Sequence, residues 1–420
     1  MRCRRIPTTL LTRVHAALIV VVLTAAAADA KENILYAFTG GADGGFPQAG
    51  LTPDSSGNFY GTTLEGGSGF GVVFELSPKK GGGWTETVLY AFAGGEDGSS
   101  PEGTLIFDSA GNLYGTTAGG GKHDAGTVFE LSPAGGGGWS KTILHNFNVS
   151  DGAIPSAGLV FDTAGNLYGA TFSGGKPLDL GVIFQLSPSP DGRWKEKILL
   201  QFGHHKDGGG PAGTLILDKA GNLYGTASGG YEVSGSVFEL TPMANGHWKE
   251  TVLHGFQGKG DGGFPHGALT LDSKGNVYGT TSSGGRIDEI GPCAFGCGTV
   301  FELSPGANGK WKETVLYKFK GGEDGDGPVA GVSFDSSGNL HGTTQMGGGT
   351  GCDFQFGCGT VFELRSGGGK WHESVVHRFK SRKGGRHPLS ELIVDSRGDV
   401  YGTASDNGVG NGGLAFEITP

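Results

Sequence analysis

Apolar and polar residues alternate along the chain in short runs, and glycine, aspartate, asparagine or proline stands at the ends of each run. Alternation with a period of two, bounded by such residues, is typical of β-strands. Four runs make up one unit, and in the second unit they are GTLIFD from Gly103, NLYGTT from Asn112, GTVFELS from Gly126 and WSKTILHNF from Trp139. We therefore predict an all-β protein built from four-stranded units.

The unit recurs seven times. Variants of the motif GNLYGTT begin at Gly57, Gly111, Gly165, Gly221, Gly275, Gly338 and Gly398. Variants of FELSP follow at Phe74, Phe129, Phe184, Phe238, Phe301, Phe362 and Phe416. Successive GNLYGTT motifs are 54, 54, 56, 54, 63 and 60 residues apart, so the later units are longer and we expect the extra residues in loops. Four strands at this period fit one blade of a β-propeller.

Tryptophan opens the fourth strand of six units, at Trp84, Trp139, Trp194, Trp248, Trp311 and Trp371. After Trp84, the residues Val88, Tyr90 and Phe92 share one face, and the opposite face also carries apolar residues. A strand that is apolar on both faces indicates a sheet packed between two others. We predict that the tryptophans lie in the core.

A D-x-x-G-N motif joins the first strand of each unit to the second, as from Asp108 to Asn112. An aspartate side chain accepts hydrogen bonds from backbone N–H groups a few residues on, and glycine adopts positive φ without strain. We interpret the seven aspartates of this motif, from Asp54 to Asp395, as turn residues and not as catalytic acids.

The two ends of the chain complement each other. The segment Ile34–Phe38 resembles a fourth strand with no preceding three, and the chain ends after a third strand with no fourth. Pairing the two would complete a seventh blade and remove the exposed sheet edges. We predict a single domain over residues 31–420, a seven-bladed β-propeller of four-stranded antiparallel blades. The N-terminal strand closes the ring by joining the C-terminal blade.

Residues 1–30 lie outside the repeats. Four arginines precede the apolar run AALIVVVLTAAA, and Ala28 to Ala30 form an A-x-A cleavage pattern. An apolar run this short favours a cleaved signal peptide over a spanning helix, which needs roughly 20 residues. We therefore predict export from a bacterial cell, with the mature protein secreted or extracellular; a periplasmic location is the alternative.

Removal of residues 1–30 leaves 27 basic and 40 acidic residues, a formal charge of −13. Such a surface repels phosphate backbones, which argues against nucleic acid as a partner. The mature sequence contains no run apolar enough to span a membrane. We expect a monomer whose partner is a glycan or a protein.

The recurring GNLYGTT, GTVFELSP and W-x-E-T-V-L-Y-x-F motifs are similar to those of the choice-of-anchor tandem repeat proteins of the GloVer type, which are secreted bacterial proteins. The resemblance extends over residues 33–420. It implies a repeat architecture but no established enzymatic activity, and it supplies no catalytic residue. Members carry varied C-terminal anchoring signals, and no such signal follows Pro420 here.

We expect two kinds of loop on one face of the propeller: those between strands two and three, and those that lead from strand four to the next blade. The second kind carries a G-G-x-D-G-x-x-P theme, as in GGADGGFP from Gly40, and only the seventh copy lacks its aspartate. Asp-Gly turn chemistry, with a proline that fixes the start of the next strand, explains this theme. The alternative is a ring of calcium-binding carboxylates. We predict no other cofactor.

The fifth and sixth loops between strands two and three are the longest and hold all four cysteines of the mature chain. Each pair is local, so in an oxidising compartment we expect disulfides Cys293–Cys297 and Cys352–Cys358; a four-thiolate zinc site is the alternative. Stapled loops with aromatic tips make good binding surfaces. The candidate ligand-binding residues are Arg286, Asp288, Glu289, Phe295, Asp353, Phe354 and Phe356.

The histidines give no clear metal or catalytic motif. Four occupy positions where other units have tyrosine, namely His145, His254, His341 and His377, and we predict that they are core variants. Five others belong to the expected loop face: His123, His204, His205, His266 and His387. The stretch from His204 to Asp207 lacks a third spaced ligand, so we predict no metal site there.

Three functions fit the sequence: a non-catalytic binding propeller, a polysaccharide hydrolase or lyase, and a structural scaffold. No nucleophile motif, zinc-protease motif or phosphate loop is present. The first function is favoured. An enzyme would be expected to gather buried ionisable residues at the mouth of the central channel.

Overall fold

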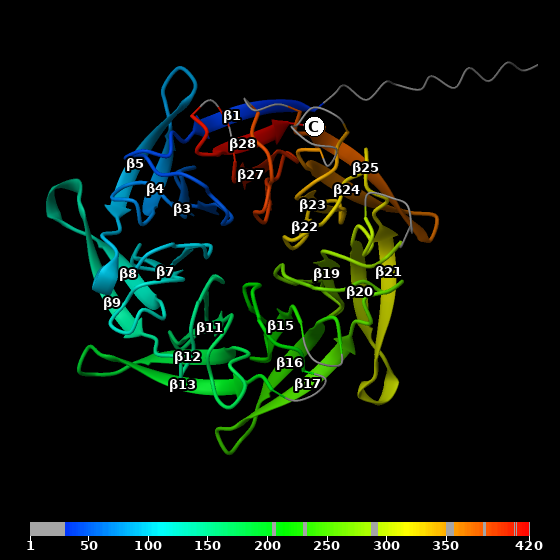
Figure 1. Cartoon of the computed structure of the whole chain (residues 1–420), viewed down its shortest axis with the longest axis horizontal. Coiled ribbons are helices and arrows are strands. Elements are labelled where there is room, and N and C mark those ends of the chain that lie inside the picture. The colour runs from blue at the N-terminus through cyan, green and yellow to red at the C-terminus, as the bar shows by residue number, and fades with distance from the viewer. Residues whose placement is uncertain are drawn as a thin grey trace, which may run out of the picture.

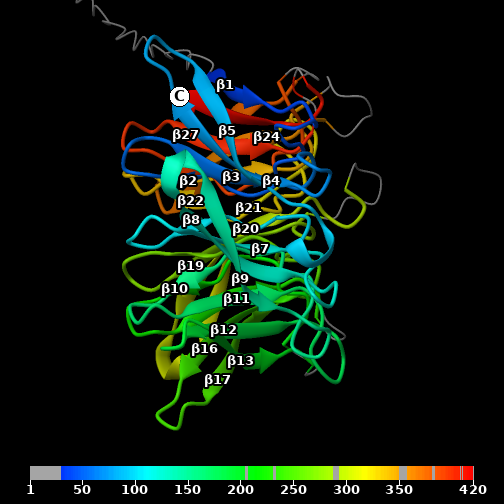
Figure 2. The ribbon, with the colours of Figure 1, turned by 90° about the vertical axis from the view of Figure 1, so that its left-hand side faces the viewer.

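The computed structural model describes residues 30–203, 207–229, 233–286, 293–349, 357–380, 384–406, 408 and 410–419. Seven four-stranded antiparallel sheets stand around a central axis and form a ring (Figure 1). Seen from the side, the sheets stack around the axis and loops project from both faces of the ring (Figure 2). The fold is the predicted seven-bladed β-propeller.

Strand length increases from the centre of the ring to its edge. The innermost strands have two residues each: β2 (Thr52–Pro53), β6 (Ile106–Phe107), β10 (Val160–Phe161), β14 (Ile216–Leu217), β18 (Thr270–Leu271), β22 (Ser333–Phe334) and β26 (Ile393–Val394). The second strands have five: β3 (Phe59–Thr63), β7 (Leu113–Thr117), β11 (Leu167–Thr171), β15 (Leu223–Ala227), β19 (Val277–Thr281), β23 (Leu340–Thr344) and β27 (Val400–Ala404).

The two outer strands of each blade are longer. The third strands are β4 (Val72–Pro78), β8 (Thr127–Pro133), β12 (Val182–Pro188), β16 (Ser236–Pro242), β20 (Thr299–Pro305), β24 (Thr360–Gly367) and β28 (Leu414–Thr419). The outermost strands are β5 (Trp84–Ala91), β9 (Trp139–Asn146), β13 (Trp194–Gln201), β17 (Trp248–Gly255), β21 (Trp311–Lys318), β25 (Lys370–Arg378) and β1 (Lys31–Ala37). Within the residues that the structure describes, three short 3₁₀ helices lie in loops: η1 (Gly95–Asp97), η2 (Gly135–Gly137) and η3 (Ala307–Gly309).

The N-terminal strand closes the ring as predicted. Strand β1 pairs antiparallel with β28, from Lys31 opposite Thr419 to Ala37 opposite Leu414 (Figure 1). The strand begins three residues before the predicted segment, because the backbone pairing continues beyond the apolar residues. The last blade therefore combines three C-terminal strands with one N-terminal strand, and its sheet has the same order as the other six.

A phenylalanine and a glycine from the two recurring motifs pack against each other in every blade. In the second blade, the ring of Phe129 on β8 lies over Gly115 on β7, where a Cβ atom would come within 2.7 Å of the ring. Phe129 is fully buried and also meets Phe92 from the preceding blade, with ring centroids 5.3 Å apart. Glycine is thus required in LYGTT because the phenylalanine of FELSP occupies the space above it.

The same phenylalanine pair joins every blade to the next. Ring centroids lie 4.9–5.4 Å apart in Phe38–Phe74, Phe92–Phe129, Phe147–Phe184, Phe202–Phe238, Phe256–Phe301, Phe319–Phe362 and Phe379–Phe416. These pairs form the core between the blades. The tryptophans pack against this core but are only half-buried, because they stand at the outer ends of the sheets.

The turn aspartates act as predicted. Asp108 accepts backbone hydrogen bonds from Ala110 and Asn112 on Oδ1, at 2.8 and 2.9 Å, and the Asn112 side chain donates to Oδ2 at 2.8 Å. Partial burial disfavours the charged form of Asp108, but these hydrogen bonds outweigh it and lower its pKa. Because the carboxylate is occupied by its own turn, it is not free to act as a catalytic acid.

Half-buried glutamates stand on the outermost strands of the blades. Glu86 faces Asp43 and Glu196 faces Asp151, and each aspartate belongs to an adjoining loop. Burial raises the pKa of both glutamates to about 7, and the neighbouring aspartate adds to this effect. Glu32 and Glu373 also have pKa values of about 7, mainly because of burial.

We expect the protein to become more stable on mild acidification. A carboxyl group whose folded pKa exceeds its unfolded value stabilises the fold when protonated, and this contribution is lost as the pH rises through 7. The turn aspartates, whose pKa values are lowered, lose their contribution only below about pH 4. Calorimetry should therefore give a higher melting temperature at pH 6.5 than at pH 8, a range above the one in which histidines with lowered pKa values, such as His377, oppose the effect. The double variant Glu86→Gln, Glu196→Gln should flatten this slope. An unchanged slope in the double variant would contradict the assignment.

Candidate functional site

The two predicted kinds of loop share one face of the ring. In the first blade, Gly45 of the loop before strand one pairs with Glu65 of the loop after strand two. Equivalent bridges join Ser99 to Gly119, Ala153 to Ser173, Gly263 to Ser283, Asp326 to Met346 and Arg386 to Asp406. The two loops of a blade therefore stand together, and the face that carries them is called the loop face below.

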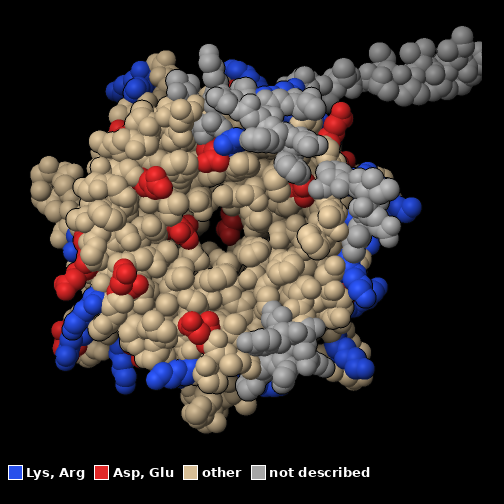
Figure 3. All heavy atoms as spheres, in the orientation of Figure 1, with Lys and Arg blue, Asp and Glu red and all other residues tan. Residues whose placement is uncertain are grey.

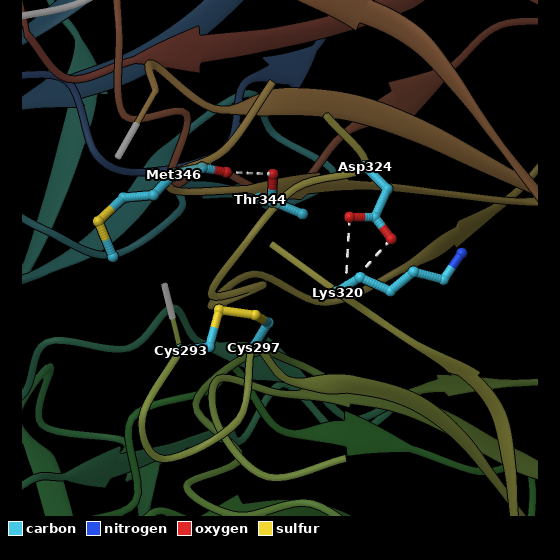
Figure 4. The surroundings of a disulfide bond; sticks show 6 residues. All are labelled: Cys293, Cys297, Lys320, Asp324, Thr344 and Met346. Carbon is cyan, nitrogen blue, oxygen red and sulfur yellow. Dashed lines mark hydrogen bonds between the residues drawn. A yellow bond between two sulfur atoms is a disulfide. The ribbon is translucent and has the colours of Figure 1, made fainter. Parts of the chain in front are cut away.

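The loop of the fifth blade holds the first predicted disulfide. Cys293 and Cys297 are bonded, with Cα atoms 5.1 Å apart, and both are buried (Figure 4). The bond lies beside residues of the sixth blade, including Met346, and the backbone N–H of Gly327 donates to the Cys297 carbonyl at 3.0 Å. The disulfide therefore fixes the base of this loop against the neighbouring blade. Since these two sulfur atoms are bonded to each other, a four-thiolate zinc site is not formed.

The structure places two of the seven predicted ligand-binding residues. Phe295 is 82% exposed, between the two bonded cysteines in sequence, and Arg286 lies at the start of the same loop. The other five lie outside the described residues: Asp288, Glu289, Asp353, Phe354 and Phe356. Cys352 is also outside them, and Cys358 is buried. The second disulfide and the predicted aromatic cluster therefore stay predictions.

A channel at the centre of the ring is lined by residues of all seven blades. Its cavity has a volume of about 330 Å³ and is lined by the segment that follows the loop proline in each blade. The first residue after that proline differs from blade to blade: Gln48, Glu102, Ser156, Ala212, His266, Val329 and Leu389. Figure 3 shows the opening, with Asp and Glu side chains around it and Lys and Arg mainly at the outer edge of the ring. No Lys or Arg lines this cavity among the residues that the structure describes.

Three ionisable groups of the channel have shifted pKa values. Burial raises the pKa of Glu102 and lowers that of His266. Burial also raises the pKa of Glu391, against the effect of a hydrogen bond from the backbone N–H of Ala268. All three shifts favour the uncharged form. Burial is the cause of the pKa shifts of both Glu102 and His266, and no charge of a neighbouring group contributes to them. These two residues therefore do not form a coupled acid–base pair.

Glu391 breaks the symmetry of the channel. In two other blades the equivalent residue is a threonine that accepts the backbone N–H of the preceding blade, as Thr104 does from Gly50 at 3.2 Å and Thr214 from Gly158 at 3.1 Å. The sixth blade has Gly331 at this position, so Glu391 of the seventh blade reaches Ala268 of the fifth. One carboxyl group thus spans a sector that small residues leave open.

The residue before each loop proline has positive φ, and these seven residues form a ring in which each member stands two positions before a channel-lining residue. Five of the seven are not glycine: Phe46 (φ 59°), Ser100 (56°), Ile154 (58°), Phe264 (55°) and His387 (52°). A non-glycine residue in this region costs roughly 1–2 kcal/mol, and a β-branched one is a genuine outlier. The ring is called the mouth ring below; its other two members are Gly210 and Gly327.

Backbone hydrogen bonds hold each member of the mouth ring between two blades. The N–H of Phe264 donates to the Ser234 carbonyl of the preceding blade at 2.6 Å, and the Phe264 carbonyl accepts from Ser282 at 3.2 Å. Ile154 makes the same two bonds, with Ala125 and Phe172. These bonds enforce the conformation whatever the side chain is, yet the side chains of Phe264 and Ile154 are 46% and 43% exposed.

The Asp-Gly loops follow the turn interpretation. The carboxylates of Asp43, Asp97 and Asp261 accept a backbone N–H from the start of their own loops, at 2.7–2.9 Å. Asp151, Asp207 and Asp324 are held in the same way. Calcium at these loops stays an untested alternative.

The histidines divide as the sequence indicated. His145, His254 and His377 are half-buried and make edge-to-face contacts with Phe147, Phe256 and Phe379, as Tyr36 does with Phe38. His266 faces the channel and His387 belongs to the mouth ring, where its Nδ1 lies 2.7 Å from Asp406 Oδ2. His204 and His205 lie outside the described residues, and Asp207 is buried.

Sequence reasoning did not identify the channel residues Glu102 and Glu391 or the mouth ring, and its candidate residues in the fifth and sixth loops stay a prediction. One signal was available: the strands repeat closely, whereas the residues on either side of the loop proline vary. The positive φ before proline could not be expected, because proline disfavours helical conformations in the residue before it.

Comparison with known proteins gives a family and a fold. A model of the Gloeobacter/Verrucomicrobia repeat family matches residues 20–189 and 136–350. A crystal structure of a protein from Lactobacillus plantarum is similar with a TM-score of 0.50 and 14% sequence identity, over 80% of this chain and 85% of that one. At that identity the likeness concerns the fold alone. No curated protein sequence matches the chain.

Proposed function

The chain belongs to the Gloeobacter/Verrucomicrobia repeat family, and from that premise we propose that it is an exported, non-catalytic propeller that binds a neutral glycan at the mouth of its channel. The signal-like segment at residues 1–30 supports export. In the parts of the chain that the structure describes, no helix has the length and hydrophobicity needed to cross a bilayer.

The mouth ring carries the proposal. Glycine would satisfy the positive φ and both backbone hydrogen bonds, as it does at Gly327, where nothing crowds the position of a side chain. Phe46, Ile154 and Phe264 instead keep bulky apolar side chains in a strained conformation, each two residues before a residue that lines the channel. Strain that the fold does not need is a sign of function. Rigid aromatic side chains at the rim of a polar cavity suit the apolar faces of sugar rings.

The lining of the channel favours a neutral ligand. Gln48, Ser156 and Gln345 offer uncharged donors and acceptors, and burial keeps Glu102 and His266 toward their uncharged forms. No Lys or Arg of the described ranges lines the cavity to pair with a uronate or a sulfate, and acidic side chains surround its opening. A cavity of about 330 Å³ suits the end of a glycan chain and not its middle.

The second candidate function is a glycan hydrolase or lyase. The shifted pKa values of Glu102, His266 and Glu391 favour it, because perturbed ionisable groups are frequent at active sites. Against it, burial alone accounts for the shifts of Glu102 and His266, and Glu391 is hydrogen-bonded to the channel wall. Paired carboxyl groups are what glycosidic cleavage requires. Binding is therefore the better supported of the two.

The test compares binding with stability. The mature protein should bind neutral hexasaccharides of glucose, mannose or xylose more tightly than galacturonate or alginate hexasaccharides, without releasing reducing ends. The double variant Phe46→Gly, Phe264→Gly should lose at least about tenfold in affinity, since interface aromatics of this kind contribute on the order of 1–2 kcal/mol. Its free energy of unfolding should stay within about 1 kcal/mol of wild type, because relief of backbone strain offsets the lost contacts of partly exposed rings.

Phe70→Ala is the matched control. Phe70 is 42% exposed in the loop between strands two and three of the first blade, outside the mouth ring, and its loss should leave glycan affinity unchanged. Wild-type glycan affinity in the Phe46→Gly, Phe264→Gly variant would show that the mouth ring is not part of the binding site. Cleavage of any neutral hexasaccharide would favour the enzyme instead.

A further inference from the structure

One position on the second strand differs in a single blade. Six units have a tyrosine there: Tyr60, Tyr114, Tyr168, Tyr224, Tyr278 and Tyr401. The hydroxyl of Tyr224 lies 3.2 Å from Asp218 Oδ2 and 3.1 Å from Glu239 Oε1, between the turn aspartate and a glutamate of the third strand. In the sixth blade the same two carboxylates are present as Asp335 and Glu363, but the aromatic residue is His341.

Histidine is too short to replace the tyrosine hydroxyl. Nε2 of His341 is 3.5 Å from Asp335 Oδ2, beyond the usual range for a hydrogen bond, and Nδ1 has no partner among the described residues. His341 is only 4% exposed. Buried polar groups are nearly always hydrogen-bonded, and one that is not costs about 1–3 kcal/mol. The imidazole is thus buried without the hydrogen bonds that its surroundings would normally supply.

Three ligand groups converge at the place of the missing hydroxyl. Asp335, His341 and Glu363 each contribute one potential ligand atom, and these three atoms lie within 4.8 Å of one another. The side chains of Glu363 and Asp335 are 7% and 14% exposed. A cavity of about 290 Å³ adjoins all three residues and leaves room for a further ligand such as water.

We propose that Asp335, His341 and Glu363 bind one divalent transition metal ion, with Zn²⁺ as the best fit. An imidazole and two carboxylates with an open fourth position are a ligand set that zinc accepts, and zinc ligands are normally held by further hydrogen bonds. Asn339 Nδ2 donates to Asp335 Oδ2 at 2.8 Å, and the backbone N–H groups of Ser337 and Asn339 donate to its Oδ1.

The surrounding charges permit a cation. Arg365 Nε pairs with Glu363 Oε1 at 2.7 Å, but its side chain is 68% exposed and leaves the other carboxylate oxygen for the metal. Arg397, which also lines the cavity, pairs with Asp395 and Asp399 of the seventh blade. Arg365 is therefore the arginine that pairs with a carboxylate of the site, whereas the charge of Arg397 is paired elsewhere.

Zinc titration of the metal-free mature protein, against a chromophoric zinc indicator, tests the site. Wild type should bind one equivalent, and the melting temperature should rise when the metal is added. His341→Tyr restores the residue of the other six units, so it should fold normally, with a melting temperature in EDTA no lower than that of wild type. It should lose zinc affinity at least about tenfold, as expected for loss of a ligand.

Tyr224→His supplies the converse variant. Asp218 and Glu239 already occupy the places of Asp335 and Glu363, so this variant should gain a second equivalent of zinc. Retention of wild-type zinc affinity by His341→Tyr would overturn the proposal. Loss of zinc in His145→Tyr instead would also overturn it, because His145, Asp151 and Glu196 form another cluster of three potential ligands.

Discussion

A protein that begins at residue 41 is expected to lose the folded ring. Strand β1 forms the outer edge of the seventh blade, and the adjoining Phe38 is fully buried against Phe74 of the first blade. Removal of residues 31–40 exposes the edge of β28 and separates the last blade from the first. Because each blade is stabilised chiefly by its neighbours, opening the ring exposes two blade faces at once.

The matched control begins at residue 30, which removes only the residues before the described fold. This protein should melt cooperatively and stay monomeric, whereas the shorter one should aggregate or show no cooperative transition by calorimetry. A residue-41 protein with unchanged melting temperature and solubility would show that the β1–β28 pairing does not hold the ring together.

Phe129→Ala is expected to lower the free energy of unfolding by about 3–5 kcal/mol, the usual cost of removing a buried phenylalanine. Its ring is fully buried over Gly115 and against Phe92, so truncation leaves a cavity between two blades. Chemical denaturation measures the loss. Phe295→Ala, at an 82% exposed position, should change stability by less than about 0.5 kcal/mol. Equal effects of the two substitutions would contradict the assigned core.

Much of the fold could be predicted because the determining contacts are local or repeated. The turn at Asp108 involves residues within six positions, and the pairing of Gly115 with Phe129 recurs in every unit. Closure by β1 could be predicted too, since an unpaired strand at each end of the chain leaves few alternatives. The sequence also indicated which loops share a face.

The candidate site was harder to predict from the sequence, because it depends on contacts between residues of different blades. Nothing near Glu391 in sequence indicates that its carboxyl group reaches Ala268, two blades away. The positive φ of Phe46 and Ile154 opposes the local preference before proline, and only the backbone hydrogen bonds between blades explain it. His341 could be recognised as a replacement for tyrosine, but the convergence with Asp335 and Glu363 required the structure.

The most direct test of the binding site is amide hydrogen exchange of the mature protein with and without the best-binding neutral hexasaccharide. We predict slower exchange in peptides that contain residues 46–50, 100–104 and 264–268, which form the channel wall and its rim, and no change in the outermost strands such as β9. Two results would contradict binding at the channel. One is protection confined to the turns around Asp54 and Asp108, on the other side of the blades. The other is unchanged exchange in the channel wall at saturating ligand.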